Sequence, residues 1–134
     1  MTEYVSDFKY NDLNIKISFN VEESKKHIVD DLNVINNEGV DKIISEKFIP
    51  WLKGEQFKDS DDEKIKAGLS LYEVQYHYDK ICKEYSPTGK EDYFGQFSFY
   101  FESGSEYTDD IFEVVEMEVY VYNNEIVKVI GYDI

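Results

Sequence analysis

Alternation of apolar and polar residues marks strands near the start of the chain. Residues 13–19 (LNIKISF) alternate cleanly, which is typical of a strand buried on one face. Residues 4–10 (YVSDFKY) precede them, and Asn11–Asp12 supplies a short turn. The two segments together predict a hairpin that opens the fold.

The middle of the chain has a helical period. Between about residues 28 and 52, apolar residues recur at three and four positions, which predicts helices. Gly39 interrupts this pattern, and Pro50 is expected to kink or end the second helical segment. Ser60 and Glu63 have capping-box spacing, so a short helix is expected over about residues 61–68.

From residue 69 onward the period changes to two. In a strand, one face of LSLYEVQYHY would carry Tyr72, Val74, Tyr76 and Tyr78. A helical period also fits this segment. Residues 86–89 (SPTG) predict a loop. In the strand that follows, Phe97, Phe99 and Phe101 form one apolar face.

Two further strands are predicted at the end of the chain. In IFEVVEMEVYVY one face is apolar except for Glu113, and its apolar members are Ile111, Val115, Met117, Val119 and Val121. The opposite face carries Glu116, Glu118, Tyr120 and Tyr122. Asn123–Asn124 turns the chain into the last strand. A three-residue loop there would place Lys128 opposite the acidic face, but the sequence leaves this register open.

These elements predict one α+β domain spanning residues 1–134. Consecutive strands joined by short turns favour an antiparallel sheet, made of the N-terminal hairpin and four C-terminal strands. A block of two to three helices can cover only one face of that sheet. The other face is expected to be partly wet and to carry Tyr, Glu and Asp side chains.

The chain is strongly acidic, which limits its partners. It has 14 basic residues and 29 acidic ones, for a net charge of −15. Within residues 91–134, Lys128 is the one basic residue against eleven acidic residues. Nucleic acids and anionic membranes bind proteins through Lys and Arg, so neither is an expected partner. The sequence contains no Arg at all, which also argues against phosphoryl-transfer chemistry.

Cysteine usage and the lack of targeting signals favour the cytoplasm. Cys82 is the only cysteine and cannot close an intramolecular disulfide. The first ten residues lack the basic and apolar regions of a signal peptide. No apolar stretch approaches the roughly 18 residues needed to span a membrane. We therefore expect a cytoplasmic protein.

No metal or cofactor site is expected. The acidic run at residues 59–63 resembles the start of a calcium loop, but Lys64 and Ser70 occupy the positions where an EF-hand needs Gly and Glu. Capping of a helix is the favoured explanation of these acids. A second acidic group offers a less favoured divalent-cation site: Glu102, Glu106, Asp109 and Asp110.

No catalytic residue is predicted either. His77 lies five residues before Cys82, and a buried structural thiol is the favoured reading of this cysteine. One Cys and two separated His are a poor zinc site. An alternative remains open, namely an enzyme or small-ligand-binding domain with a cleft between helices and sheet that contains Glu73 or Glu113.

The order of elements and the ending NNEIVKVIGYDI resemble a group of small bacterial α+β domains of unknown function. Some of these domains lie near polymorphic toxin systems and are suspected immunity proteins. Members often carry a Glu-His-Gly stretch before the penultimate strand, whereas this chain has Glu113-Val114-Val115 there. No role attached to that stretch is carried over. The resemblance implies a bacterial protein that neutralises a toxin.

The acidic C-terminal third predicts a non-catalytic protein that binds a basic protein partner. Tyr is enriched at interface hot spots, and a surrounding acidic field accelerates the docking of a cationic partner. The expected binding residues are Glu102, Glu106, Tyr107, Asp109, Asp110, Glu116, Glu118, Tyr120 and Tyr122. Two simpler explanations stay open: the aromatic residues serve sheet packing, and the charge serves solubility.

Overall fold

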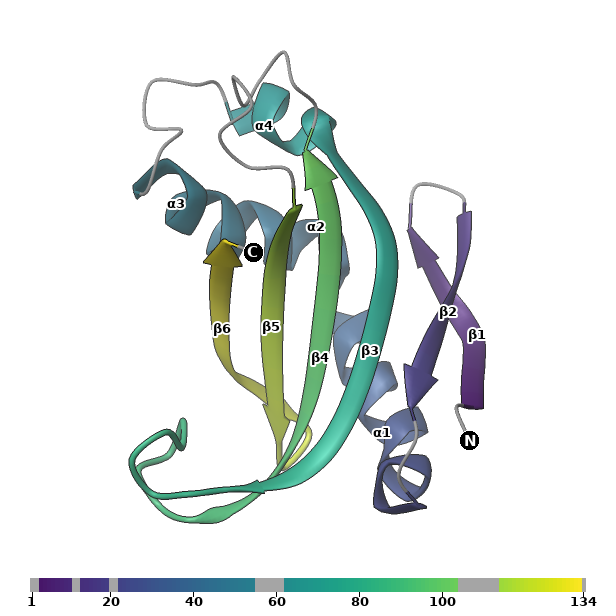
Figure 1. Cartoon of the computed structure of the whole chain (residues 1–134), viewed down its shortest axis with the longest axis vertical. Helices are drawn as coiled ribbons and strands as arrows, with labels where there is room; N and C mark the ends of the chain where they lie inside the picture. Colours follow the sequence, from purple (N-terminus) through teal and green to yellow (C-terminus); the bar gives the residue numbers. More distant parts are fainter. Residues whose placement is uncertain (1–2, 11–12, 20–21, 55–61, 104–113, 134) are drawn as a thin grey trace.

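The fold is described from a computed structural model, which places residues 3–10, 13–19, 22–54, 62–103 and 114–133. These residues form a six-stranded curved sheet with helices on one of its faces (Figure 1). The predicted α+β class is confirmed. The strands are β1 (Glu3–Tyr10), β2 (Leu13–Phe19), β3 (Leu69–Ile81), β4 (Asp92–Ser103), β5 (Val114–Tyr122) and β6 (Glu125–Asp133).

The sheet is mixed, so the prediction of a purely antiparallel sheet is wrong. The strands lie side by side in sequence order, and every neighbouring pair is antiparallel except β2 and β3. The helices connect these two strands. A chain that leaves one strand, passes through helices across the sheet and returns to the next strand makes a crossover, and a crossover connects parallel strands.

The helical block starts with α1 (Glu22–Glu38), which ends where expected, at Gly39. Gly39 has a φ of 91°, a value that glycine adopts without strain. The chain then continues without a break through α2 (Val40–Ile43), the π-helical segment η1 (Ile44–Phe48) and α3 (Ile49–Leu52). The short α4 (Asp62–Gly68) leads into β3.

Pro50 does not end the second helical segment. It lies at the start of α3 but inside the continuous helical run, where a missing N–H leaves one carbonyl of the preceding turn without its usual helical donor. The π-helical turn of η1 lies directly before it. A π turn shifts hydrogen bonding to more distant carbonyls. The helical run therefore passes the proline and continues to Leu52.

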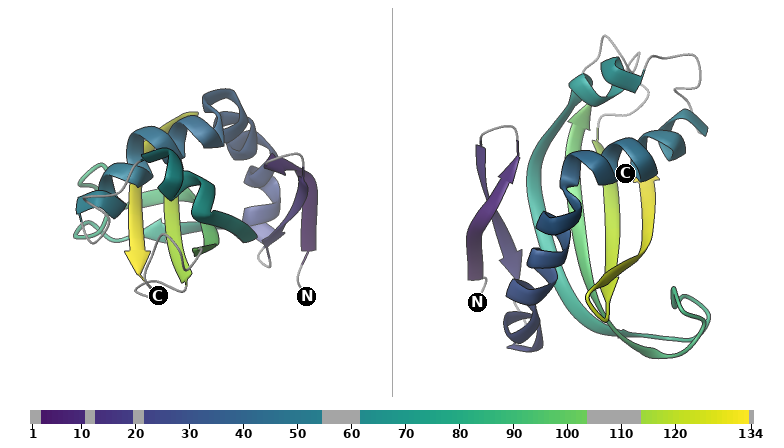
Figure 2. Two further views of the ribbon diagram at one scale, coloured as in Figure 1. Left: turned by 90° about the horizontal axis from the view of Figure 1, so that it is seen from above. Right: turned by 180° about the vertical axis from the view of Figure 1, so that it is seen from behind.

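The concave face of the sheet holds the core. Phe97, Phe99 and Phe101 of β4 are completely buried, as their alternation predicted. Helix α1 covers them with Ile28, Leu32 and Ile35. The β1–β2 hairpin closes the same core from the other side. Its rings pack on β4, with centroids 5.7 Å apart for Phe8–Phe99 and 6.3 Å apart for Tyr10–Phe101. Seen from above, the helices lie on one side of the sheet (Figure 2).

A bulge in β3 corrects one predicted face. The pairing of β3 with β4 shifts between Leu71 and Glu73, so that Leu71 and Val74 are buried while Tyr72 is 49% exposed. A bulge inserts one extra residue and reverses the alternation on either side of it. Tyr72 therefore does not share the face of Val74 and Tyr76, as the sequence suggested.

The β5–β6 turn has two residues, not three. Asn123 and Asn124 have φ angles of 50° and 61°, the left-handed values of a type I′ turn. A register shift after Tyr120 then restores the pairing, so that Lys128 lies opposite Tyr120 and Val129 opposite Val119. Lys128 thus reaches the acidic face by means of a bulge in place of a longer loop.

Candidate acidic interface

The face of the sheet opposite the helices carries a cluster of carboxyl and phenol groups. Glu116 and Glu118 of β5 point to this open face, because the alternate residues Val115, Met117 and Val119 are completely buried on the other side. Strand pairing places Tyr100 and Tyr132 on either side of Glu116. The same pairing places Ser98 beside Glu118. We call Ser98, Tyr100, Glu116, Glu118, Tyr120 and Tyr132 the acid-tyrosine cluster.

Glu118 is the centre of the hydrogen bonds in this cluster. The hydroxyl group of Tyr120 donates to Glu118 Oε1 over 2.9 Å, and Tyr132 also donates to this carboxylate. A further hydrogen bond joins the carboxyl groups of Glu116 and Glu118. The cluster is therefore an ordered network and not a set of independent surface charges.

Glu116 has a perturbed acidity. Partial burial raises the pKa of its carboxyl group, the hydrogen bond to Glu118 raises it further, and the pKa reaches about 7. The hydroxyl group of Ser98, whose side chain is only 3% exposed, hydrogen-bonds to Glu116 and lowers the pKa in part. Near neutral pH the Glu116 carboxyl group is therefore partly protonated, and an approaching cation would favour its ionised form.

The tyrosines of the cluster remain protonated at neutral pH. Burial is the main cause that raises the pKa of Tyr100, Tyr120 and Tyr132, and the nearby carboxylates raise it further. Each phenol is thus a hydrogen-bond donor with an apolar ring. Tyr132 is among the exposed large side chains, and the Lys128 ammonium group lies 6.0 Å from the ring centre of Tyr120.

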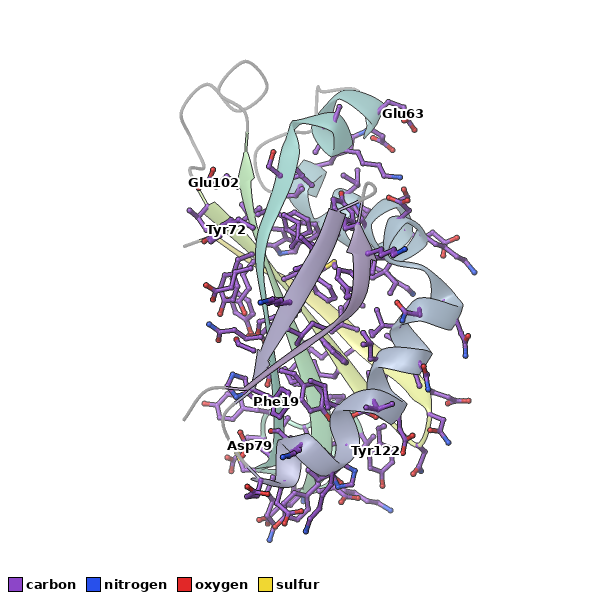
Figure 3. The ribbon with its side chains drawn as sticks, turned by 90° about the vertical axis from the view of Figure 1, so that its right-hand side faces the viewer. Phe19, Glu63, Tyr72, Asp79, Glu102 and Tyr122 are labelled. Atoms are coloured by element: carbon purple, nitrogen blue, oxygen red, sulfur yellow. The ribbon has the colours of Figure 1, made fainter. Side chains whose placement is uncertain are left out.

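Of the nine predicted binding residues the structure describes five, and four of these lie in or beside the acid-tyrosine cluster. Glu116, Glu118 and Tyr120 are in the cluster itself. Glu102 lies close enough to Tyr72 to raise the pKa of its phenol, after burial as the main cause. Figure 3 shows Tyr72 and Glu102 together, on the side of the sheet away from the helices. Tyr72 in turn packs against Tyr100, with ring centroids 6.4 Å apart, so this pair borders the cluster.

Tyr122 belongs to a different group. Its hydroxyl donates to Asp92 Oδ2 over 2.6 Å, and its ring packs 5.0 Å from that of Phe94. These contacts tie the end of β5 to the start of β4. The remaining predicted residues, Glu106, Tyr107, Asp109 and Asp110, lie outside the residues that the structure describes, and so do Ser60, Ile111 and Glu113.

Three members of the cluster were not among the predicted binding residues and come from neighbouring strands: Ser98 and Tyr100 from β4, and Tyr132 from β6. Ser98 alternates with the buried Phe97 and Phe99, so the period of β4 places it on the open face. Tyr132 belongs to β6, and its position beside Glu116 can be predicted only when the β5–β6 register is known. The period was visible in the sequence, whereas the register was not.

Glu73 does not lie in a cleft between helices and sheet. It is exposed on the open face and accepts a hydrogen bond from Gln75. The bulge before Glu73 turns its side chain away from the core, which corrects the expectation of an inward carboxylate. The polar contact beneath α1 is instead made by Tyr76, whose buried hydroxyl donates to Asp31. Burial is the main cause that raises the pKa of Asp31.

Cys82 is exposed, so its interpretation as a buried thiol is wrong. It follows the end of β3, where the β3–β4 hairpin extends beyond β5 and β6 and leaves the core behind (Figure 1). Its sulfur is 3.6 Å from Glu84 Oε2. Within the described part of the chain, no three His, Cys, Asp or Glu side chains gather closely enough to hold a metal ion.

Comparison with known proteins adds no relative: no family model, no curated protein and no solved structure matches the chain. The resemblance to suspected immunity domains therefore stays a prediction. Among the described helices, none is both long and apolar enough to cross a membrane.

Proposed function

We propose that this chain is a non-catalytic binding protein that docks a basic protein partner on its open face. The observation that carries the proposal is the hydrogen-bonded pair Glu116–Glu118, set among tyrosines on a sheet face that no described element covers. Such a surface offers negative charge and rigid aromatic rings at the same place, which is the composition of interface hot spots.

The partner is expected to present Lys or Arg to this face. An incoming cation favours the ionised form of Glu116 and releases its proton, while the phenol rings of Tyr100, Tyr120 and Tyr132 provide apolar contact area. An immunity-type protein that neutralises a toxin with a cationic active site would use such a face. Charge also steers the encounter and thereby accelerates association.

The test compares two double variants that lose the same charge. Glu73→Gln/Glu118→Gln removes two carboxylates from the open face, and Glu22→Gln/Glu84→Gln removes two exposed carboxylates elsewhere. Protein captured from a lysate of the source organism is identified, purified and measured by biolayer interferometry at low and high salt. A toxin encoded next to this chain is the first candidate.

We expect the captured protein to be basic and its association rate to fall with salt. The open-face variant should lower that rate by about tenfold, because the steering charges are gone. The matched variant should stay close to wild type. A partner whose association ignores salt, or one weakened equally by both double variants, would contradict the proposal.

A further inference from the structure

A second acidic feature lies on the other side of the sheet, between α1 and the β5–β6 hairpin. Helix α1 runs in one direction over the sheet and the α2–η1–α3 run crosses it in another (Figure 2). The angle between them leaves part of the concave face over β6 uncovered. The structure has a groove of about 640 Å³ there, a volume within the range of small-molecule sites.

The groove has an apolar floor and a polar rim. Ile43 is buried in the floor, and Val34 and Val129 are partly buried beside it. The exposed rim carries four carboxylates, three asparagines and one lysine, Lys47. A ligand that fits must therefore combine an apolar body with groups that carboxylates attract.

Three of the rim carboxylates have no cationic partner among the residues that the structure describes. Glu38 pairs with Lys42 over 3.3 Å, but Asp30, Glu46 and Glu125 make no ion pair with any described residue. They come from three separate elements, namely α1, η1 and the start of β6. The groove thus has unneutralised negative charge on several sides of an apolar surface.

The spacing of these carboxylates does not suit a compact cation. No three potential metal ligands in the described residues lie close enough to share one ion. Separated carboxylates around an apolar floor suit an elongated cation, with ammonium groups at intervals along an aliphatic chain. The methylene segments would contact Val34, Ile43 and Val129 while the ammonium groups reach the rim.

We infer that this groove binds a linear aliphatic polyamine. The site is separate from the acid-tyrosine cluster, because the groove lies on the helix side of the sheet and the cluster on the opposite face. The inference does not rest on the proposed docking function. Either one can fail without the other.

The test is calorimetric titration of the full chain with spermidine at about 0.15 M salt, where weak surface attraction is screened. The groove variant is Asp30→Asn/Glu46→Gln/Glu125→Gln. Its matched control is Glu22→Gln/Glu63→Gln/Glu84→Gln, which removes the same charge from other exposed positions. A further variant, Asn37→Trp, places a large ring at an exposed rim position and leaves the charge unchanged.

We expect saturable binding of one spermidine per chain. The groove variant should bind spermidine about tenfold more weakly, because it loses three exposed ionic contacts. The control variant should change the affinity by less than about twofold. Asn37→Trp should also weaken binding, and Glu73→Gln/Glu118→Gln should leave it unchanged. Magnesium ion at equal ionic strength should not displace the amine.

Three results would overturn the inference. One is the absence of saturation. Another is an equal loss of spermidine binding in the groove variant and its control, which would assign the effect to net charge. The third is an oligolysine peptide that binds the groove where spermidine does not, since that would make the site a peptide site.

Discussion

At the scale of single residues, Glu116 connects the acid-tyrosine cluster to stability. Its pKa lies at about 7, above the ordinary 4.5, because of burial and the neighbouring Glu118. The folded protein therefore holds this proton more tightly than the unfolded chain does. Between about pH 4.5 and pH 7 the folded state binds more protons, so the contribution of this group to the free energy of unfolding falls as pH rises.

Glu116→Gln should remove that pH dependence. The neutral amide cannot ionise, so the variant should be more stable than wild type at pH 8 by about 1 kcal/mol, a value reduced because the carboxyl is partly exposed. The gain should be smaller at pH 5, where the folded wild type keeps its proton. Urea denaturation at the two pH values measures both differences. Glu84→Gln, at an exposed site, should show no such change, and an equal gain for Glu116→Gln at both pH values would argue against a raised pKa.

Residue contacts within one strand were predictable, and those across the fold were not. The alternation in β5 correctly separated Glu116 and Glu118 from Met117, because strand side chains have a period of two. The bond between Tyr76 and Asp31 spans 45 positions, and no local pattern indicates it. The predicted face of Tyr72 was wrong for a related reason, because a bulge depends on the pairing with the partner strand.

At the scale of elements, Gly131 sets how closely the helices approach β6. The indole ring of Trp51 packs directly over this glycine, and any Cβ there would overlap the ring. Trp51 also stacks on Phe48 with centroids 6.0 Å apart, and Phe48 reaches Phe101 in the core. The glycine, the tryptophan and the core rings therefore form one continuous contact between α3, η1 and the sheet.

Gly131→Ala should displace Trp51 and loosen this contact. Overpacking of a buried site typically costs about 1–3 kcal/mol, which we expect as the loss in free energy of unfolding. Trp51 is the only tryptophan of the chain, so a shift in its fluorescence emission reports the displacement directly. Gly54→Ala is the matched control, since a Cβ at Gly54 has nothing within 4 Å. An unchanged emission spectrum and unchanged stability would show that the position of the Trp51 indole ring does not depend on this glycine.

The elements themselves were largely readable from period and punctuation. Residues 13–19 form β2 as predicted, and Gly39 ends α1, because alternation and a missing side chain act locally. The parallel pairing of β2 and β3 was not predicted. Short turns favour antiparallel pairs, but β2 and β3 are connected by a block of helices and not by a short turn. That block makes the connection a crossover, a property of the whole path and not of either strand.

At the scale of the whole molecule, two electrostatic effects oppose each other. The chain has a net charge of −15, and its acidic side chains repel one another more strongly in the compact state than in the expanded one. Against this act five ion pairs between described residues, for example Lys53–Asp62 at 2.7 Å and Lys66–Asp41 at 3.4 Å. Their side chains are mostly well exposed, and such pairs contribute only about 0.2–1 kcal/mol each.

Added salt should therefore stabilise the protein. Raising sodium chloride from about 0.01 M to 0.15 M shortens the screening length from about 30 Å to about 8 Å, which weakens long-range repulsion more than contacts of 3 Å. We expect the free energy of unfolding, measured by urea denaturation, to increase by about 1 kcal/mol. Choline chloride should act equally, because screening does not depend on the cation. A loss of stability with salt would mean that the ion pairs outweigh the repulsion, and a gain confined to sodium would indicate a specific ion site instead.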